Sequence, residues 1–376
     1  MIKLTMKKVL VVLFGSVFIY SLVSLAKIIN TLAPDFSVYY ASAHSLLTHQ
    51  SLYTIHSFTV FNYPPISSLF FVPFVLLPYQ LAQGIFVSLS YLCIFACIVL
   101  CFKILNKKIA WQIFLIISAL FLLSFPTKFT LGMGQSNLIA YTLFLLSVFL
   151  ENKSKKIFSG IILAIAIILK PIFVLLILYF LFKKSWNSMF TTIITGLILL
   201  VFQQLFFAQT FSQWTTYITH ILPGLMTTKG REVYYNQGLL GTISRFTTNL
   251  EARQIFNWIG VIIILADGIK NILQTKNNQL TLSVLLCTLP LIDSLSWQHH
   301  FVILLFPFLF TYYQLKNSKQ GVSLLAISYL LISANIKNPN NYMWFPVSIA
   351  LSHVFWGTLL LLMLLLYSAK ILQRGK

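Results

Sequence analysis

The sequence predicts an all-α protein that crosses a membrane many times. Of its 376 residues, 58% are hydrophobic and only 9% are charged, whereas charged residues make up about 25% of an ordinary soluble domain. The mean hydropathy is +0.87. Long apolar runs recur along the whole chain and are separated by short clusters of lysine. This alternation is typical of polytopic membrane proteins.

The formal charge of +20 comes from 26 Lys and Arg against 6 Asp and Glu. In a soluble protein such an excess would suggest nucleic-acid binding. Here the cations lie in short clusters between apolar runs, which is how membrane topology is encoded, so we reject that class. Three of the four cysteines, Cys93, Cys97 and Cys101, share one helix face, and we interpret them as small apolar residues rather than ligands.

The apolar runs predict about twelve transmembrane helices, because about 20 apolar residues cross a bilayer. They lie at about 7–28, 80–102, 110–126, 137–150, 157–169, 171–182, 188–207, 254–270, 279–292, 299–314, 321–336 and 345–369. The first follows a basic N-terminus and is expected to stay as a signal anchor. The runs on either side of Lys170-Pro171 are short, and Pro breaks the helical ladder there, so we expect two half-helices.

The basic residues place both termini on the cytoplasmic side. With the N-terminus inside and alternating spans, most of the 26 Lys and Arg fall on one face, as the positive-inside rule requires. The exceptions are Lys27, Lys128, Lys170, Lys229, Arg231, Arg245, Arg253 and Lys337. Two long loops, at about 29–79 and 208–253, then face outward, and we expect them to contain short helices that lie on the membrane. The whole chain, 1–376, is expected to form a single integral-membrane domain.

Asp35 is the most informative residue. The six carboxylates are Asp35, Glu151, Glu232, Glu251, Asp267 and Asp293. Asp35 directly follows the first apolar run, and an acid kept at such a position is by default a functional candidate. The alternative interpretation is a helix N-cap after Pro34, a role that Asp often fills.

Most other unusual polar residues fall on the same outward face, where they suit a lipid-phosphate substrate. Asp35 is a suitable general base for a hydroxyl. The candidates for holding phosphate are Lys170, Arg245, His299 and His300, with Arg231 considered as well. The candidates for bonding sugar hydroxyls are Gln135, Asn137, Asn236 and Gln237, and those for stacking on a sugar ring are Trp297, Tyr39 and Tyr40.

Each of these residues has a simpler interpretation. Lys170 can extend its ammonium to the membrane interface, and interfacial Tyr and Trp usually anchor a protein in the bilayer. We interpret Arg231 and Arg253 as ordinary loop charges. Either His299 or His300 can cap a helix or face water. Asp293 is open to three roles: a second acid, a metal ligand or the partner of a nearby cation. His44, His49 and His56 are interpreted as solvated loop residues.

Six short motifs in order then give a family resemblance. They are Asp35-Phe36 through Ala41, Leu52-Tyr53 with Tyr63-Pro64-Pro65, Gly134-Gln135-Ser136-Asn137, Gly160 through Lys170-Pro171, Asn236-Gln237-Gly238-Leu239 with Arg245, and Ser294 through His300. Over most of its length the chain resembles glycosyltransferase family 87, the polyprenol-phosphate-mannose-dependent mannosyltransferases among the C-type membrane glycosyltransferases. It departs from the pattern at Gly238, where a small hydroxyl residue is expected, at Leu295, where a proline is common, and at Asp293.

The resemblance implies the C-type glycosyltransferase fold and a transfer that inverts the anomeric centre. The donor would be a hexose, usually mannose, on a polyprenyl phosphate, and the acceptor a glycolipid or glycan at the outer face of the plasma membrane. Asp35 would be the catalytic base. From their residue types, charge and outward placement, rather than from the resemblance, we expect substrate to be bound by Tyr39, Tyr63, Gln135, Asn137, Lys170, Asn236, Gln237, Arg245, Trp297, His299 and His300. Neither a bound metal, a nucleotide sugar nor another cofactor is expected.

Two other function classes remain open at this point. A transporter or flippase of lipid-linked glycans also has about twelve spans and broken helices, but it should carry ionisable residues near the bilayer midplane. Here the inner half holds only Glu151 and Asp267, both near loops, which favours the enzyme. A ligase that moves whole glycans from undecaprenyl diphosphate is the third class, and the order of the motifs argues against it.

Overall fold

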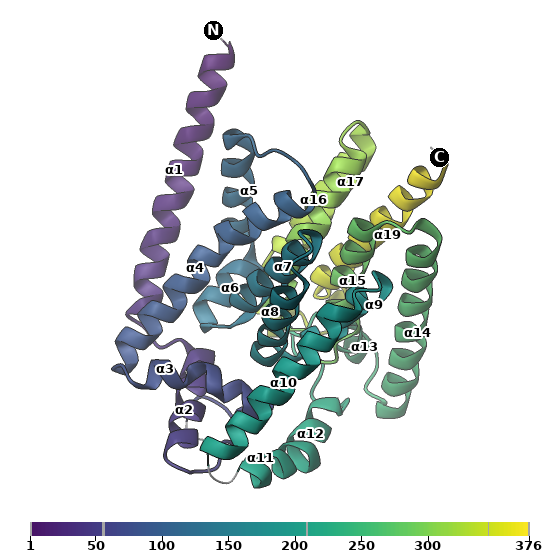
Figure 1. Cartoon of the computed structure of the whole chain (residues 1–376). Coiled ribbons are helices and arrows are strands. Elements are labelled where there is room, and N and C mark those ends of the chain that lie inside the picture. Colours follow the sequence, from purple (N-terminus) through teal and green to yellow (C-terminus); the bar gives the residue numbers. More distant parts are fainter. Residues whose placement is uncertain (1, 55–56, 208–209, 345, 375–376) are drawn as a thin grey trace. The chain divides into compact units, whose positions relative to one another are not determined.

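The computed structural model describes residues 2–54, 57–207, 210–344 and 346–374. Within these residues every regular element is a helix, which confirms the predicted all-α class (Figure 1). The chain forms two compact units. The first comprises Met1–Leu123, Thr127–Val174 and Lys184–Leu225, and the second Ser124–Pro126, Leu175–Lys183 and Met226–Lys376.

The helices of the first unit are α1 Ile2–Ile29, α2 Pro34–Leu47, η1 Pro65–Phe71, α3 Val72–Val75, α4 Tyr79–Ile104, α5 Trp111–Leu123, α6 Phe125–Met133, α7 Asn137–Asn152, α8 Lys156–Leu169, α10 Trp186–Phe206, α11 Thr210–Thr216, η3 Tyr217–Ile221 and α12 Leu222–Met226. Two of them, α6 and α12, extend by one or two residues across the boundary with the second unit. Two short elements are not α-helices: η1 is a 3-10 helix and η3 is a π-helical turn.

The second unit contains α9 Ile177–Phe182, α13 Leu239–Phe246, α14 Leu250–Thr275, α15 Asn278–Ile292, η4 Gln298–Leu304, α16 Leu305–Leu315, α17 Lys319–Ser333, η5 Pro339–Tyr342, α18 Val347–Ala350 and α19 His353–Arg374. Helix α15 is its core, because nearly every side chain from Leu280 to Leu291 is buried. Helices α14, α16 and α19 pack around it.

Each predicted apolar run falls on a helix, but the helices differ in length. Among the described residues, five helices are long and apolar enough to span a membrane: Val11–Ile29, Tyr79–Ile104, Trp186–Phe206, Leu250–Thr275 and His353–Lys370. A sixth span results if α5 and α6, which are bent by 62°, count as one. The other apolar helices have 10–17 residues, and at about 1.5 Å per residue most fall short of a core about 30 Å thick. Twelve spans therefore stay a prediction.

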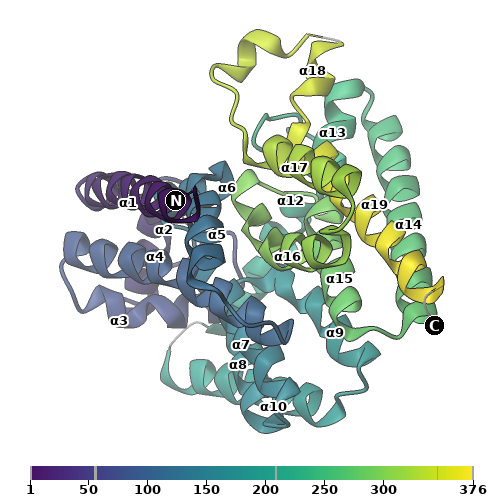
Figure 2. The same ribbon diagram turned by 90° about the horizontal axis from the view of Figure 1, so that it is seen from above.

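Small residues bring the central helices of the first unit together (Figure 2). A Cβ atom on Gly160 would lie 2.5 Å from the backbone oxygen of Ser188, so only glycine lets α8 approach α10 this closely. The hydroxyls of Ser147 and Ser159 each donate to the other residue's carbonyl, at 2.8 and 2.9 Å, which joins α7 to α8. Such small and hydroxyl residues are the usual contacts between membrane helices.

One local prediction about the backbone, the helix break at Lys170-Pro171, is confirmed. Helix α8 ends at Leu169, Lys170 is extended with φ −140° and ψ 91°, and a 3-10 helix begins at Pro171, so the chain breaks where proline predicted it. The ranges predicted to be long outward loops contain short helices, α2, η1 and α3 in 29–79 and α11, η3, α12 and α13 in 208–253. That these helices lie on a membrane surface stays a prediction.

Candidate functional site

Asp35 lies in the first turn of α2, one residue after the proline that starts the helix. It is not the N-cap, because Ala33 occupies that position and no side chain caps the helix. A carboxylate in the first turn is still stabilised by the helix dipole. Burial nevertheless raises the pKa of Asp35 above its ordinary value, while the hydrogen bond from Gln135 and the charge of Lys170 act in the opposite direction.

Gly134 brings Gln135 to Asp35. Its φ of +66° lies in the left-handed region, which glycine adopts without penalty. A Cβ atom there would lie 2.7 Å from the Cβ of Phe36 and 2.9 Å from that of Ala33. Glycine therefore meets two requirements at once: the turn before α7 and close contact with the start of α2.

Five of the predicted site residues form one hydrogen-bonded group, which we call the Asp35 network: Asp35, Tyr39, Tyr63, Gln135 and Lys170. The Gln135 amide is at its centre, donating from Nε2 to Asp35 Oδ2 at 2.8 Å. The Tyr39 hydroxyl donates to Gln135 Oε1 at 2.7 Å. Lys170 Nζ donates to the Tyr63 hydroxyl at 2.9 Å and lies 3.5 Å from Gln135 Oε1.

The cation of this network is buried. Lys170 is only 4% exposed, and the helix break at its own backbone turns the side chain inward instead of along α8. Its Nζ also lies 5.3 Å from the centroid of the Tyr63 ring. Tyr63 is held in turn by Tyr53, whose hydroxyl donates to the Tyr63 carbonyl at 2.9 Å. Lys170 does not extend to an interface, so the simpler interpretation of this residue does not fit.

The position of Tyr39 limits what it can do. Its ring is 2% exposed and stacks on Phe71 with centroids 4.5 Å apart. Burial and the neighbouring Tyr63 and Asp35 raise the pKa of its hydroxyl well above the ordinary range, so it stays protonated as a donor. Stacking on a sugar does not fit this burial. Asn137 lies two residues beyond Gln135, buried at the start of α7.

Gln83 positions Asp35 and was not among the predicted site residues. It is fully buried on α4, and its Oε1 accepts from the Ala33 amide at 3.0 Å. Its Nε2 donates to the carbonyls of Ile28, Ile29 and Thr31. One side chain thus fixes the turn between α1 and α2. The available signal was a glutamine within the first turns of an apolar run, three residues after Gln80.

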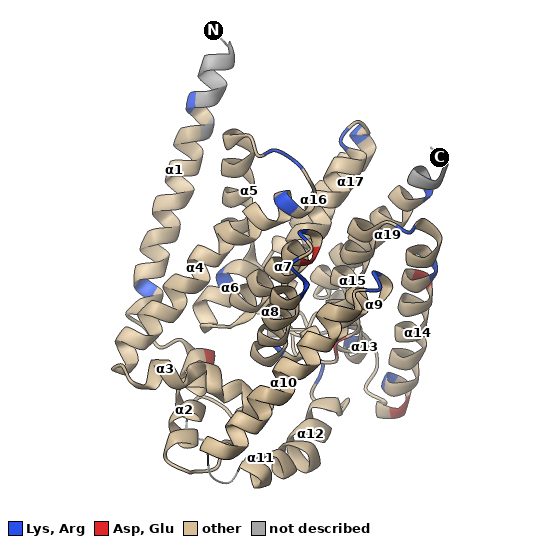
Figure 3. Cartoon of the chain, viewed as in Figure 1, with Lys and Arg blue, Asp and Glu red and all other residues tan. Residues whose placement is uncertain are grey.

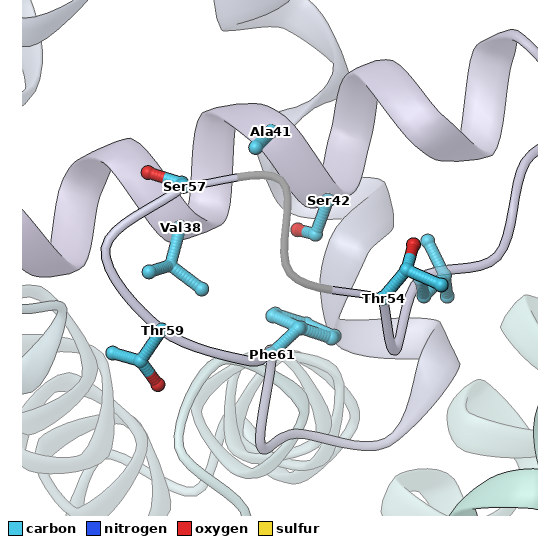
Figure 4. Close-up of a pocket in the computed structure, with 8 residues that line it drawn as sticks. Val38, Ala41, Ser42, Thr54, Ser57, Thr59 and Phe61 are labelled. Carbon is cyan, nitrogen blue, oxygen red and sulfur yellow. The ribbon is translucent and has the colours of Figure 1, made fainter.

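A small cavity lies beside α2 (Figure 4). It is lined by Val38, Ala41, Ser42, Leu52, Thr54, Ser57, Thr59 and Phe61. Its volume is about 10 Å³, enough for roughly one water molecule. It is therefore too small to hold a sugar ring.

In the second unit, two motifs are joined by backbone hydrogen bonds. Asn236 and Trp297 form an antiparallel bridge, with Gln237 N donating to Ser296 O at 2.7 Å and Gln298 N to Tyr235 O at 2.9 Å. Gly238 permits this approach, because a Cβ there would lie 2.6 Å from Asp293 O. The hydroxyl residue that the family pattern suggests at this position would not fit.

The side chains of Asn236 and Gln237 are fully buried and bond to backbone. Asn236 Nδ2 donates to the carbonyls of Arg231 and Ser294 at 3.2 and 3.1 Å. Gln237 Nε2 donates to Tyr234 O and Leu351 O, and its Oε1 accepts from Val354 N. These amides hold segments of the second unit together, which leaves them little capacity for sugar hydroxyls.

Arg245 is similarly engaged. It is 7% exposed, and burial lowers its pKa to about 10. Its Nε and Nη2 bond to the Ser352 hydroxyl at 3.0 and 2.8 Å. Its Nη1 donates to the carbonyls of Val233 and Asn236 at 3.1 and 3.0 Å. In this structure the guanidinium therefore ties α13 to the 232–236 segment and to the turn before α19.

The remaining predicted residues are Trp297, His299 and His300. The rings of Trp297 and His299 form an aromatic row with Tyr235, which was not predicted. The rings of Trp297 and His299 are nearly parallel, at 4°, with centroids 6.3 Å apart, and Tyr235 lies parallel to Trp297 within 15°. At its end, His300 Nδ1 lies 3.2 Å from Asp293 Oδ2. Asp293 thus contacts a neighbouring histidine, and the choice among the three roles left open by the sequence stays a prediction.

The interpretation of Arg231 and Arg253 as ordinary loop charges is wrong. Both are buried, at 7% and 6% exposure. Arg253 donates to the carbonyls of Thr247, Thr228 and Ser244 and pairs with Glu232 at 3.1 Å. Arg231 Nε donates to Thr227 O at 2.7 Å. By contrast, His44 and His49 are exposed as expected, and His56 lies outside the described residues.

Acidic residues are few in this chain, six in all, and appear as sparse red segments in Figure 3. A model of glycosyltransferase family 87 matches residues 61–333. The chain belongs to glycosyltransferase family 87. Membership in this family implies a membrane glycosyltransferase, with a sugar donor and an acceptor. No curated protein matches the chain.

The match to glycosyltransferase family 87 covers most of the predicted site. It includes Tyr63, the Gln135 turn, Lys170, and both motifs of the second unit. Asp35 and Tyr39 precede residue 61, but they are joined to the matched region by the Gln135 amide.

Proposed function

We propose that this protein transfers a hexosyl residue, most simply mannosyl, from a polyprenyl-phosphate donor to a glycolipid or glycan acceptor. The whole chain would act as one integral-membrane domain of about twelve spans with the C-type glycosyltransferase fold. Both termini would be cytoplasmic, and the site would face the outer side of the plasma membrane. The distribution of Lys and Arg supports this orientation.

One observation carries the proposal: a carboxylate and an ammonium meet at the same buried amide. Asp35 Oδ2 accepts from one end of the Gln135 amide at 2.8 Å, and Lys170 Nζ lies 3.5 Å from the other end. Transfer from a sugar phosphate needs a base for the acceptor hydroxyl and a cation for the departing phosphate. The Asp35 network supplies both.

The proposed reaction is a single displacement. Asp35 takes the proton of the acceptor hydroxyl as that oxygen forms a bond to the anomeric carbon. The bond from this carbon to the phosphate oxygen breaks, and the polyprenyl phosphate leaves with the electron pair. Lys170 stabilises the negative charge of the departing phosphate, with the Tyr63 hydroxyl beside it. Attack opposite the leaving group inverts the anomeric centre.

In the second unit, we propose that Trp297, His299 and His300 contact substrate, because the aromatic row is partly exposed at Trp297 and ends in the contact between His300 and Asp293. Aromatic faces and histidine side chains are groups that sugars and phosphates bind. Asn236, Gln237 and Arg245 would act by holding this row and its loop in place, since their polar atoms bond to backbone and to Ser352. Family membership favours this enzyme over a transporter.

The test is the transfer of radiolabelled mannose from polyprenyl-phosphate-mannose to membrane lipids, by the wild type and by Asp35→Asn. We expect incorporation by the wild type and a loss of at least about 10²-fold in the variant, the usual scale for a general base. Equal incorporation by both proteins would remove Asp35 from the base role and make Asp293 the next residue to test. The exposed carboxylate Glu251 offers a matched control, Glu251→Gln.

A further inference from the structure

The orientation of the Gln135 amide is fixed by its neighbours. Two donors, the Tyr39 hydroxyl at 2.7 Å and Lys170 Nζ at 3.5 Å, converge on its oxygen. The oxygen must therefore face them, and the NH₂ group must face Asp35 Oδ2. Gln135 is 6% exposed, so it cannot exchange these partners freely for bulk water.

The carboxylate of Asp35 has few other charged neighbours. Its own helix presents Tyr39, and the segment before η1 presents Tyr63. The sequences of η1 and α3, which pack on α2, contain no titratable residue. From α4, Tyr79 bonds to Gln83 at 2.8 Å. Lys170 is therefore the cation whose charge Asp35 experiences, across a single amide.

We propose that Gln135 couples Asp35 to the occupancy of Lys170, so that an anion bound to Lys170 makes Asp35 a stronger base. The ammonium stabilises the ionised carboxylate, and a bound phosphate cancels that effect. Asp35 then holds a proton more tightly, which favours its removal from the acceptor hydroxyl. The inference rests on the proposed function in taking Asp35 as the base and Lys170 as the contact for the donor phosphate.

The size of the effect follows from the geometry. One amide and two hydrogen bonds limit the distance from Lys170 Nζ to the Asp35 carboxylate to roughly 9 Å. At an effective dielectric constant of about 20, two unit charges at this distance shift a pKa by about one unit. Donor binding should therefore raise the pKa of Asp35 by about one unit. At a given pH, a larger fraction of the Asp35 carboxyl groups would then be protonated at equilibrium.

The sequence makes a direct measurement practical, because the chain has only three aspartates: Asp35, Asp267 and Asp293. The full-length protein in nanodiscs would carry ¹³C at the aspartate carboxyls, and Asp35→Asn would assign the Asp35 resonance. Its titration midpoint would be measured without ligand, with inorganic phosphate and with farnesyl phosphate. We expect farnesyl phosphate to raise the midpoint by about one unit.

Two variants test the coupling without relying on ligand binding. Lys170→Gln keeps a hydrogen-bonding side chain but removes the charge, so its midpoint should already be about one unit higher and should not respond to farnesyl phosphate. Lys170→Arg keeps the charge and should behave as the wild type. Gln135→Leu removes the hydrogen bond to the carboxylate and should also raise the midpoint, whereas Leu in place of the exposed Gln274 should have no effect.

An unchanged Asp35 midpoint in Lys170→Gln, or an equal response to farnesyl phosphate in that variant and the wild type, would overturn the inference. A response to inorganic phosphate alone would show that the headgroup suffices. These readouts do not depend on turnover. A shift of the Asp35 midpoint with farnesyl phosphate but no sugar transfer would refute the proposed function and leave the inference standing. Sugar transfer without a shift of the midpoint would refute the inference and leave the proposed function standing.

Discussion

Gly134→Ala should disrupt the Asp35 network more than any other change of one methyl group. Alanine at φ +66° costs about 1–2 kcal/mol, because its Cβ approaches the following carbonyl. That Cβ would also lie 2.7 Å from Phe36 and 2.9 Å from Ala33, and both contacts are Cβ atoms that cannot rotate away. Overpacking of this kind typically costs about 1–3 kcal/mol more. The expected loss is therefore about 2–5 kcal/mol.

Gly230 supplies the control. Its φ is +72°, and a Cβ there would meet nothing within 4 Å. Gly230→Ala should therefore cost only the backbone penalty of about 1–2 kcal/mol. Asparagine separates the backbone penalty from the steric clash of the Cβ atom, because it tolerates the left-handed region but carries a Cβ. Asparagine should be nearly neutral at position 230 and still harmful at position 134.

The assay is thermal unfolding of the full chain in detergent together with sugar transfer. A loss of 1 kcal/mol lowers Tm by about 2–4 °C in domains of this size. Gly134→Ala should also reduce transfer, because relief of the clash moves α2 away from Gln135. Equal Tm losses at the two glycines would refute the steric argument, and full transfer activity in Gly134→Ala would show that the contact with α2 does not position Asp35.

Three further predictions follow from buried polar groups. Burial raises the pKa of Asp35 in the folded protein. The protonated residue therefore contributes its full stability below the ordinary pKa of 3.8, and this contribution is lost as the pH rises through the higher folded pKa. The Asp35→Asn variant should therefore unfold at a higher temperature than the wild type at pH 7 and at a similar temperature at pH 4. The acid limb of kcat/KM should correspondingly lie above pH 3.8. Arg253→Met should cost about 3 kcal/mol by leaving buried carbonyls unpaired, whereas Glu232→Gln, at an exposed partner, should cost less than about 1 kcal/mol in the same denaturation assay. Gln83→Leu should lower kcat more than it changes KM, because it releases the turn before Asp35, and a KM effect alone would contradict that role.

The sequence predicted the helices and the break at Lys170 because these depend on local properties, apolar length and the missing proline donor. It also selected all five members of the Asp35 network. The number of spans stays a prediction, because several of the predicted runs form helices of only 10–17 residues, shorter than a bilayer usually requires.

The roles of Gln83, Arg231 and Arg253 were not predictable for a different reason. Most of the hydrogen bonds described for them go to backbone groups, which every residue carries, so no sequence pattern marks them. Gln83 bonds to residues 50–55 positions away. The same holds for Asn236 and Gln237, which the family motif makes conspicuous but whose amides bond to backbone.

Most buried charged groups of this chain are bonded to backbone carbonyls or hydroxyls, and the different environment of Asp35 explains why it can act as a base. Although the chain has six carboxylates, its buried Lys and Arg bond mainly to backbone groups and hydroxyls rather than to acids in the part of the chain that the structure describes. Arg245 bonds instead to carbonyls and to Ser352, and Arg253 adds three carbonyls to its one acid. The buried Glu151 is bonded to two serine hydroxyls. Asp35 differs from these groups: it is bonded to a neutral amide whose far end is shared with a cation, which leaves its proton affinity open to change by whatever binds Lys170.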